Sequence, residues 1–212
     1  MNRLAGWGTL VGVLASVNYA ARFSGESNPK DVLYRYETAV ASAVFFAVML
    51  AIVLFLARFD RSALALRRPR SWAGSFGLML AVLCVVYVLG GLLSPFLDPG
   101  KEQGLTPDRW ESARALPFFA NAVVVVLVAP ITEELTFRGL GFSLLRRFGE
   151  SWAIGVTALA FALGHGLVEG LPVLFALGVG LAYIRARQES VVPGMILHGS
   201  FNAIALAVSV TT

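Results

Sequence analysis

The sequence predicts an all-α polytopic membrane protein, a bundle of about seven transmembrane helices. Three observations lead to this prediction. Of the 212 residues, 57% are hydrophobic and only 14% are charged, whereas soluble domains carry about a quarter charged residues. The mean hydropathy is +0.74. Apolar runs of about 18 residues or more, the length that spans a bilayer, recur along the chain and are separated by charged and turn-forming residues.

The N-terminal part of the chain contains three predicted spans, at Leu4–Ala21, Ala39–Ala57 and Trp72–Leu97. The first run follows Arg3 and could be taken for a signal peptide. Its length of about 18 residues and the spans that follow it favour a retained helix. We expect one membrane domain over residues 1–212, with N-terminal spans at 4–97 and a core of spans at 115–210.

The C-terminal part contains four further apolar runs, at Leu116–Arg147, Trp152–Val168, Leu171–Ile184 and Val191–Val210. The first of these contains Pro130, which lacks a backbone N–H and can loosen the helix. The third run has only about 14 apolar residues, which is short for a span, so we expect a tilted helix or a partly re-entrant hairpin.

The distribution of basic residues predicts the orientation. The formal charge of +4 comes from clusters between the spans, which suits membrane topology and not nucleic-acid binding. If the loop Arg58–Arg70 is cytoplasmic, that side holds ten basic residues and the other side six, including Lys30, Lys101 and Arg109. This predicts a cytoplasmic N-terminus and an external C-terminus. Only two of the 17 basic residues are lysines, a skew that suggests a GC-rich bacterium and hence its inner membrane.

Polar residues inside the C-terminal spans are the strongest functional signal. They are Glu133, Glu134 and Arg138 in the fourth span, His165 in the fifth, and His198 with Asn202 in the seventh. The two histidines are the only ones in the chain. Because an ionisable group in the bilayer costs several kcal/mol unless it is paired or hydrated, its default interpretation is a functional one.

Spacing predicts which of these groups meet. Glu133 and His165 each lie 14 residues from the turn that joins their helices, about 21 Å along antiparallel neighbours, so they can face each other. Glu134 and Arg138 are four residues apart, the spacing of a helical ion pair. This leaves Glu133 free to meet His165. Gly139 and Gly141 would permit a close approach of another helix.

These residues form three ordered motifs: EExxxR at Glu133, Glu134 and Arg138, FxxxH at Phe161 and His165, and HxxxN at His198 and Asn202. In this order they resemble the CPBP family of intramembrane proteases, which includes the Rce1-type CAAX proteases, and no motif position departs from the pattern. The resemblance covers about a third of the chain, Ala129–Ala203.

The resemblance implies an intramembrane endopeptidase that needs no cofactor. It implies that Glu133 activates a water with help from His165, that His198 and Asn202 stabilise the oxyanion, and that Glu134 and Arg138 hold the site together. The implied partners are the lipid bilayer and a membrane-associated protein or peptide cut near its C-terminus. Phe161 itself is most simply a core or lipid-facing filler.

Three alternatives stay open. Glu133, His165 and His198 could hold Zn²⁺ in a metal-dependent version of the same protease, since one carboxylate and two imidazoles are an acceptable ligand set. Serine or aspartyl proteolysis has less support, because Ser200 lacks a separate histidine in register apart from His165 and no aspartate lies in a span. A non-catalytic bacteriocin-immunity or scaffold protein is the alternative of a different class.

Overall fold

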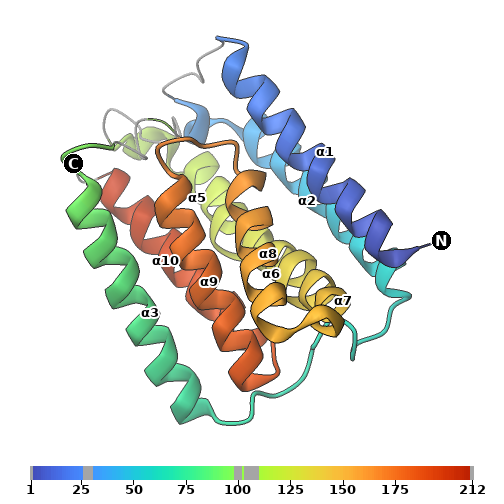
Figure 1. Cartoon of the computed structure of the whole chain (residues 1–212). Coiled ribbons are helices and arrows are strands. Elements are labelled where there is room, and N and C mark those ends of the chain that lie inside the picture. The colour runs from blue at the N-terminus through green and yellow to red at the C-terminus, as the bar shows by residue number, and fades with distance from the viewer. Residues whose placement is uncertain (1, 26–30, 98–101, 103–109, 211–212) are drawn as a thin grey trace.

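A computed structural model describes residues 2–25, 31–97, 102 and 110–210 of the chain (Figure 1). Lys30, Lys101 and Arg109, which entered the orientation prediction, lie outside these residues. The α-helices are α1 (Arg3–Phe23), α2 (Tyr36–Ala57), α3 (Trp72–Leu93), α5 (Ala115–Val123), α6 (Ala129–Glu134), α7 (Phe142–Leu145), α8 (Glu150–Gly164), α9 (Leu171–Gln188) and α10 (Val192–Ser209). No strand occurs in the described part of the chain, and the predicted all-α bundle is confirmed.

Five helical stretches in the described residues are long and apolar enough to cross a membrane: α1, α2, α3, the stretch Ser112–Phe148, and α10. The apolar helix α8 is shorter, and α9 carries two arginines in its last turn. The apolar side chains that face outward from this bundle, such as Phe55, Leu80 and Leu116, suit contact with lipid tails. The chain is therefore an integral membrane protein.

The fourth span is one continuous path that changes its helix type several times. Two π-helical segments, η3 (Val124–Val128) and η4 (Leu135–Gly141), flank the short helix α6. Three short 3₁₀ helices also occur in the described residues: η1 (Val32–Tyr34) lies between α1 and α2, and η2 (Ser112–Arg114) and η5 (Arg146–Phe148) lie at the two ends of the fourth span. Because π-helical turns are frequent at functional sites, the position of Glu133 and Glu134 between two of them makes α6 a candidate for the site.

The C-terminal helices form the middle of the bundle, and the N-terminal helices cover its sides (Figure 1). Helices α8 and α9 pack along their lengths. Helix α3 lies against α9 and α10, and α1 lies against α8. The N-terminus lies at the same end of the bundle as the loop between α2 and α3, while the C-terminus lies at the opposite end (Figure 1).

Two glycines let neighbouring segments approach the fourth span closely, as the sequence predicted. A Cβ atom at Gly139 would lie 3.0 Å from the Leu64 carbonyl oxygen, and one at Gly141 would lie 2.6 Å from the Trp7 indole. Trp7 is buried, and its indole N–H donates a hydrogen bond of 2.9 Å to the Thr136 carbonyl in η4. Helix α1 is thus joined to the π-helical segment by packing and by a polar contact.

Several elements differ from the predicted boundaries; α3, for example, ends at Leu93 and not at Leu97, and two further differences lie near the polar residues. The fifth segment was expected to run as far as Val168, but α8 ends at Gly164, and Gly166 follows with a φ of +66°, a conformation that glycine adopts readily. The sixth segment extends beyond Ile184 to Gln188. The Arg185 guanidinium near the end of α9 is buried and donates to the Arg138 carbonyl at 3.1 Å, which lets a charged residue remain inside the helix.

Candidate active site

Glu133 lies at the centre of a group formed by three helices. Its Oε2 atom is 4.0 Å from Nε2 of His165, which directly follows α8, and 3.7 Å from Nε2 of His198 in α10. The three side chains are 15%, 22% and 2% exposed. The prediction that Glu133 and His165 face each other is confirmed, and His198 joins them.

The distances within this group leave room for a water molecule. Separations of 3.7 and 4.0 Å exceed the range of a direct hydrogen bond. A water that makes two hydrogen bonds of about 2.8 Å at roughly a right angle joins two atoms about 4 Å apart. Each imidazole can therefore share a water with the Glu133 carboxylate.

The tautomer of His165 follows from its backbone contact. Its Nδ1 lies 2.8 Å from the Phe161 carbonyl oxygen. A carbonyl oxygen only accepts hydrogen bonds, so Nδ1 carries the proton and donates it. In the neutral ring, Nε2 is then an acceptor, and this is the nitrogen that faces Glu133.

The predicted ion pair of Glu134 and Arg138 is confirmed, and it lies next to this group. Arg138 donates from Nη1 to Glu134 Oε1 at 2.8 Å and from Nη2 to the Gly178 carbonyl of α9 at 3.0 Å. Both side chains are buried, with exposures of 1% for Glu134 and 0% for Arg138. Glu134 Oε1 also lies 3.4 Å from His198 Nδ1, although the two atoms are not aligned for a hydrogen bond.

Phe161 is a member of the site that the sequence interpretation treated as a filler. Its ring is fully buried and makes edge contacts with both imidazoles, at centroid distances of 4.6 Å to His165 and 5.4 Å to His198. The Arg138 guanidinium lies 4.4 Å from the same ring centroid, within cation–π range. The spacing of four residues from His165 was the available signal, because it places both side chains on one helix face.

Asn202 lies one turn beyond His198 on α10, as its spacing predicted. Its side-chain amide donates to the Val125 carbonyl in η3 at 2.9 Å. This contact gives one of the two amide N–H groups a partner, and the second N–H is available to another acceptor. The structure therefore brings Glu133, His165 and His198 together and places Asn202 beside the π-helical turn that precedes them.

The turn that follows His165 is held by the C-terminal half of α1. The Asn18 amide donates to the Gly164 carbonyl at 2.5 Å, and the Tyr19 hydroxyl donates to the Leu167 carbonyl at 3.2 Å. The same turn is too tight for a side chain at Gly166, where a Cβ atom would lie 2.8 Å from the Asn18 backbone. The sequence interpretation missed these contacts because they join residues almost 150 positions apart.

Glu102 holds the other end of that turn. Its carboxylate accepts backbone N–H groups of Val168 at 2.7 Å and Gly170 at 2.9 Å, just before α9 begins. Arg22 at the end of α1 forms a 3.0 Å ion pair with this carboxylate. A carboxylate at the first turn of a helix satisfies free N–H groups and favours the helix dipole, so Glu102 anchors α9 and the turn that carries His165.

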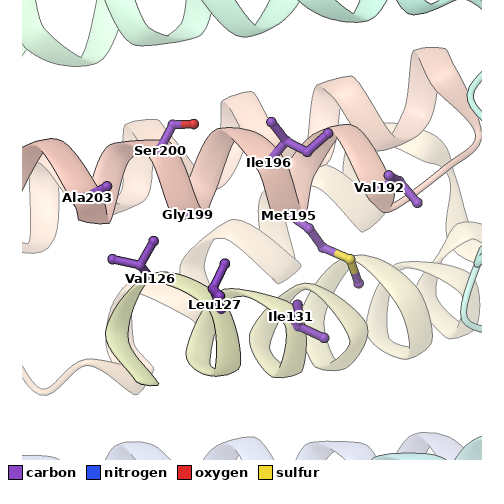
Figure 2. A pocket seen from close by; sticks show the side chains of 9 residues that line it. All are labelled: Val126, Leu127, Ile131, Val192, Met195, Ile196, Gly199, Ser200 and Ala203. Atoms are coloured by element: carbon purple, nitrogen blue, oxygen red, sulfur yellow. The ribbon is translucent and has the colours of Figure 1, made fainter. Parts of the chain in front are cut away.

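An apolar groove runs beside the site, between α10 and the η3–α6 stretch (Figure 2). Its volume is about 430 Å³. Apart from the Ser200 hydroxyl, its lining side chains are apolar; the lining residues are Val126, Leu127, Ile131, Val192, Met195, Ile196, Gly199, Ser200 and Ala203. Two lining residues, Gly199 and Ala203, directly follow His198 and Asn202 in the chain. The groove therefore places an apolar surface next to these two polar side chains.

The geometry of the described residues bears on the predicted alternative of a zinc site. Among them, no group of three or more His, Cys, Asp or Glu side chains has an arrangement suited to a metal ion. Both imidazoles approach the same carboxylate oxygen, Oε2 of Glu133. Zinc ligation requires three donor atoms that each lie about 2.0–2.2 Å from one point, so this set would have to rearrange to bind the ion.

Comparison with known proteins identifies the family of the C-terminal part. Residues 115–204 match the family model described as type II CAAX prenyl endopeptidase Rce1-like. No curated protein and no solved structure gives a significant match to the chain. The family match confirms the resemblance to CPBP and CAAX proteases, and the matched segment contains Glu133, His165, His198 and Asn202.

Proposed function

We propose that this chain is an Rce1-like protease of the CAAX type that uses a glutamate-activated water to hydrolyse a peptide bond of a membrane-associated substrate. The observation that carries this proposal is the position of the Glu133 carboxylate, within 4.0 Å of both histidines in a membrane-spanning bundle. Water is a poor nucleophile and a peptide carbonyl a poor electrophile, so the reaction needs both a base and a stabilised oxyanion.

Glu133 is proposed as the general base. A water held between its carboxylate and His165 Nε2 gives one proton to Glu133 as its oxygen attacks the scissile carbonyl. The bond from carbon to the leaving nitrogen then breaks, and Glu133 returns the proton to that nitrogen. His165 acts as an acceptor that orients the water, which agrees with its Nδ1–H being engaged by Phe161. General-base help of this kind contributes about 10²–10⁴ in rate.

His198 and Asn202 are proposed to bind the oxyanion. His198 Nε2 lies on the Glu133 side of the site, and Asn202 retains one amide N–H beyond its bond to Val125. These groups sit on the same face of α10, one turn apart, so they can donate to one oxygen. Loss of one such donor typically costs about 10²–10³ in rate. Glu134 and Arg138 are proposed as support for this arrangement.

The proposed substrate is a membrane-associated protein or peptide that is cut near its C-terminus. The apolar groove between α6 and α10 supports a substrate with an apolar segment beside the scissile bond. We further propose that the protein resides in a bacterial inner membrane with its N-terminus in the cytoplasm, because the arginine-rich loop between α2 and α3 would then lie on the cytoplasmic side.

A comparison of membrane-protein termini tests this function. Membranes from source cells that carry wild-type protein, Glu133→Gln or Glu37→Gln are compared by mass spectrometry. Glu37 is an exposed carboxylate at the start of α2 and serves as the matched control. Uncleaved precursors that accumulate only with Glu133→Gln support the proposal and identify the substrate. Identical termini in all three strains, with equal protein levels, would favour the immunity or scaffold alternative.

The zinc-dependent alternative makes a separate prediction. A site in which Glu133, His165 and His198 bind Zn²⁺ would lose cleavage activity to a strong chelator and regain it on zinc addition. The proposed metal-independent mechanism predicts unchanged cleavage after chelation. Metal analysis of the purified protein, by mass spectrometry of dissolved ions, complements this measurement.

A further inference from the structure

The break in the fourth span leaves one backbone carbonyl without its usual helical partner. In an α-helix the Val125 carbonyl would accept from the N–H of residue 129. That N–H instead donates to the Val124 carbonyl, in the π-helical register. Continuing this register would give Val125 the N–H of residue 130, but residue 130 is a proline and has none. Pro130 therefore frees the Val125 carbonyl for a side chain.

Helix α10 meets this break at two successive positions. The Asn202 amide donates to the Val125 carbonyl at 2.9 Å. One turn earlier, Gly199 packs so closely that a Cβ atom there would lie 2.7 Å from the Val126 carbonyl oxygen. Helix α10 therefore contacts the backbone carbonyls of both Val125 and Val126, and it is the helix that carries the motif HxxxN.

We infer that Pro130 is a positioning residue that acts through the Val125 carbonyl on Asn202. A carboxamide has a donor end and an acceptor end of nearly equal shape, and it can rotate. Because the Val125 carbonyl needs a donor, the Asn202 side chain is held with its amide nitrogen, and not its oxygen, toward that carbonyl. The remaining N–H then has a defined direction, so it can be presented to the substrate. This inference rests on the proposed function for its catalytic consequence.

We expect the pairing of the Val125 carbonyl to change when residue 130 regains an N–H. In the α-helical register Ala129 would bond Val125, and in the π-helical register residue 130 would bond it. In either register the Val125 carbonyl acquires a backbone donor, which competes with the Asn202 amide and weakens its hold on that carbonyl. Pro130→Ala should therefore preserve the helix, which alanine favours, and disorder the orientation of the Asn202 amide.

The test is a double-mutant cycle in cleavage kinetics with Pro130→Ala, Asn202→Ala and the combination. Asn202→Ala is expected to lower kcat about 10²–10³-fold, as for loss of an oxyanion donor. Pro130→Ala is expected to lower kcat about 10-fold or more, because small misplacements of a catalytic donor are costly, with KM unchanged. In the Asn202→Ala background Pro130→Ala should have almost no further effect. Equal effects of Pro130→Ala in both backgrounds, or full activity of the single variant, would overturn the inference.

A second double-mutant cycle tests the contact between Asn202 and the Val125 carbonyl through protein stability, without a cleavage assay. The thermal unfolding midpoint in detergent is measured for the same variants. Asn202→Ala should lower the midpoint, because the Val125 carbonyl is left without a donor, and adding Pro130→Ala should restore most of the loss. An unrestored midpoint would contradict the pairing even in a protein that cleaves nothing, so this result is separate from failure of the proposed function. Pro172→Ala, an exposed proline in the first turn of α9, is the control that should not restore it.

Discussion

Removal of the Arg138 guanidinium is the perturbation whose effect the structure defines best. In Arg138→Met the apolar stem is largely retained, but three contacts are lost: the 2.8 Å pair with Glu134, the 3.0 Å bond to the Gly178 carbonyl, and the stacking on Phe161. Since the Glu134 side chain is only 1% exposed, its charge would remain inside the bundle without its partner. Breaking a buried pair in this way costs about 3–5 kcal/mol.

The assay is thermal unfolding in detergent micelles, with Glu134→Gln/Arg138→Met as the comparison. For a chain of this size a loss of about 3–5 kcal/mol lowers the unfolding midpoint by about 6–20 °C. The double variant removes both charges and should recover much of that loss, because a neutral pair leaves no uncompensated charge. A double variant whose midpoint falls by the sum of the two single losses would refute the reasoning, since independent contributions mean that the ion pair is not coupled.

Two further predictions concern regions outside the family match. Glu102→Gln weakens the anchoring of the turn after His165, so we expect kcat to fall several-fold and the unfolding midpoint to drop; both are measured against wild type, and an unchanged kcat would contradict the role given to Glu102. Hydrogen bonds from Arg35 and then Arg114 hold the pKa of Asp31 below its ordinary value. Stability from this pairing should be complete above the ordinary carboxyl pKa, about 3.9, and be lost as pH falls through the lowered value. The gap in unfolding midpoint between wild type and Asp31→Asn should therefore be present at about pH 6 and vanish towards about pH 2.

Sequence spacing predicted those parts of the site that depend on regular helices. The pairing of Glu134 with Arg138 follows from a separation of four residues, and the approach of Glu133 to His165 follows from equal distances to a shared turn. The ion pair forms even though Arg138 lies in a π-helical segment. The family resemblance carried by the three motifs was confirmed by the match over residues 115–204.

Features that depend on the meeting of distant segments could not be predicted in this way. No periodicity indicates that Asn18 and Tyr19 of α1 hold the turn after His165, or that Glu102 caps α9. The change of register at Pro130 was expected only as a loosening of the helix. Its consequence, a carbonyl satisfied by Asn202 from another helix, requires knowledge of how α10 packs against η3.

The N-terminal helix α1 supports the site although it lies outside the matched family segment. The helix contacts both halves of the site: Trp7 donates to the π-helical segment after Glu134, and Asn18 donates to the backbone beside His165. Each contact satisfies a carbonyl at a place where regular helical bonding is interrupted. We therefore expect α1 to set the distance between the glutamate and the histidine.

The most direct test of the account is the cleavage rate of purified protein in liposomes, with a substrate found by the comparison of termini. Wild type, Glu133→Gln and Glu37→Gln are assayed with and without a strong chelator. We predict a loss of about 10²-fold or more for Glu133→Gln, wild-type rates for Glu37→Gln, and no effect of chelation. Full cleavage by a folded Glu133→Gln variant would contradict the central claim that this carboxylate activates the attacking water.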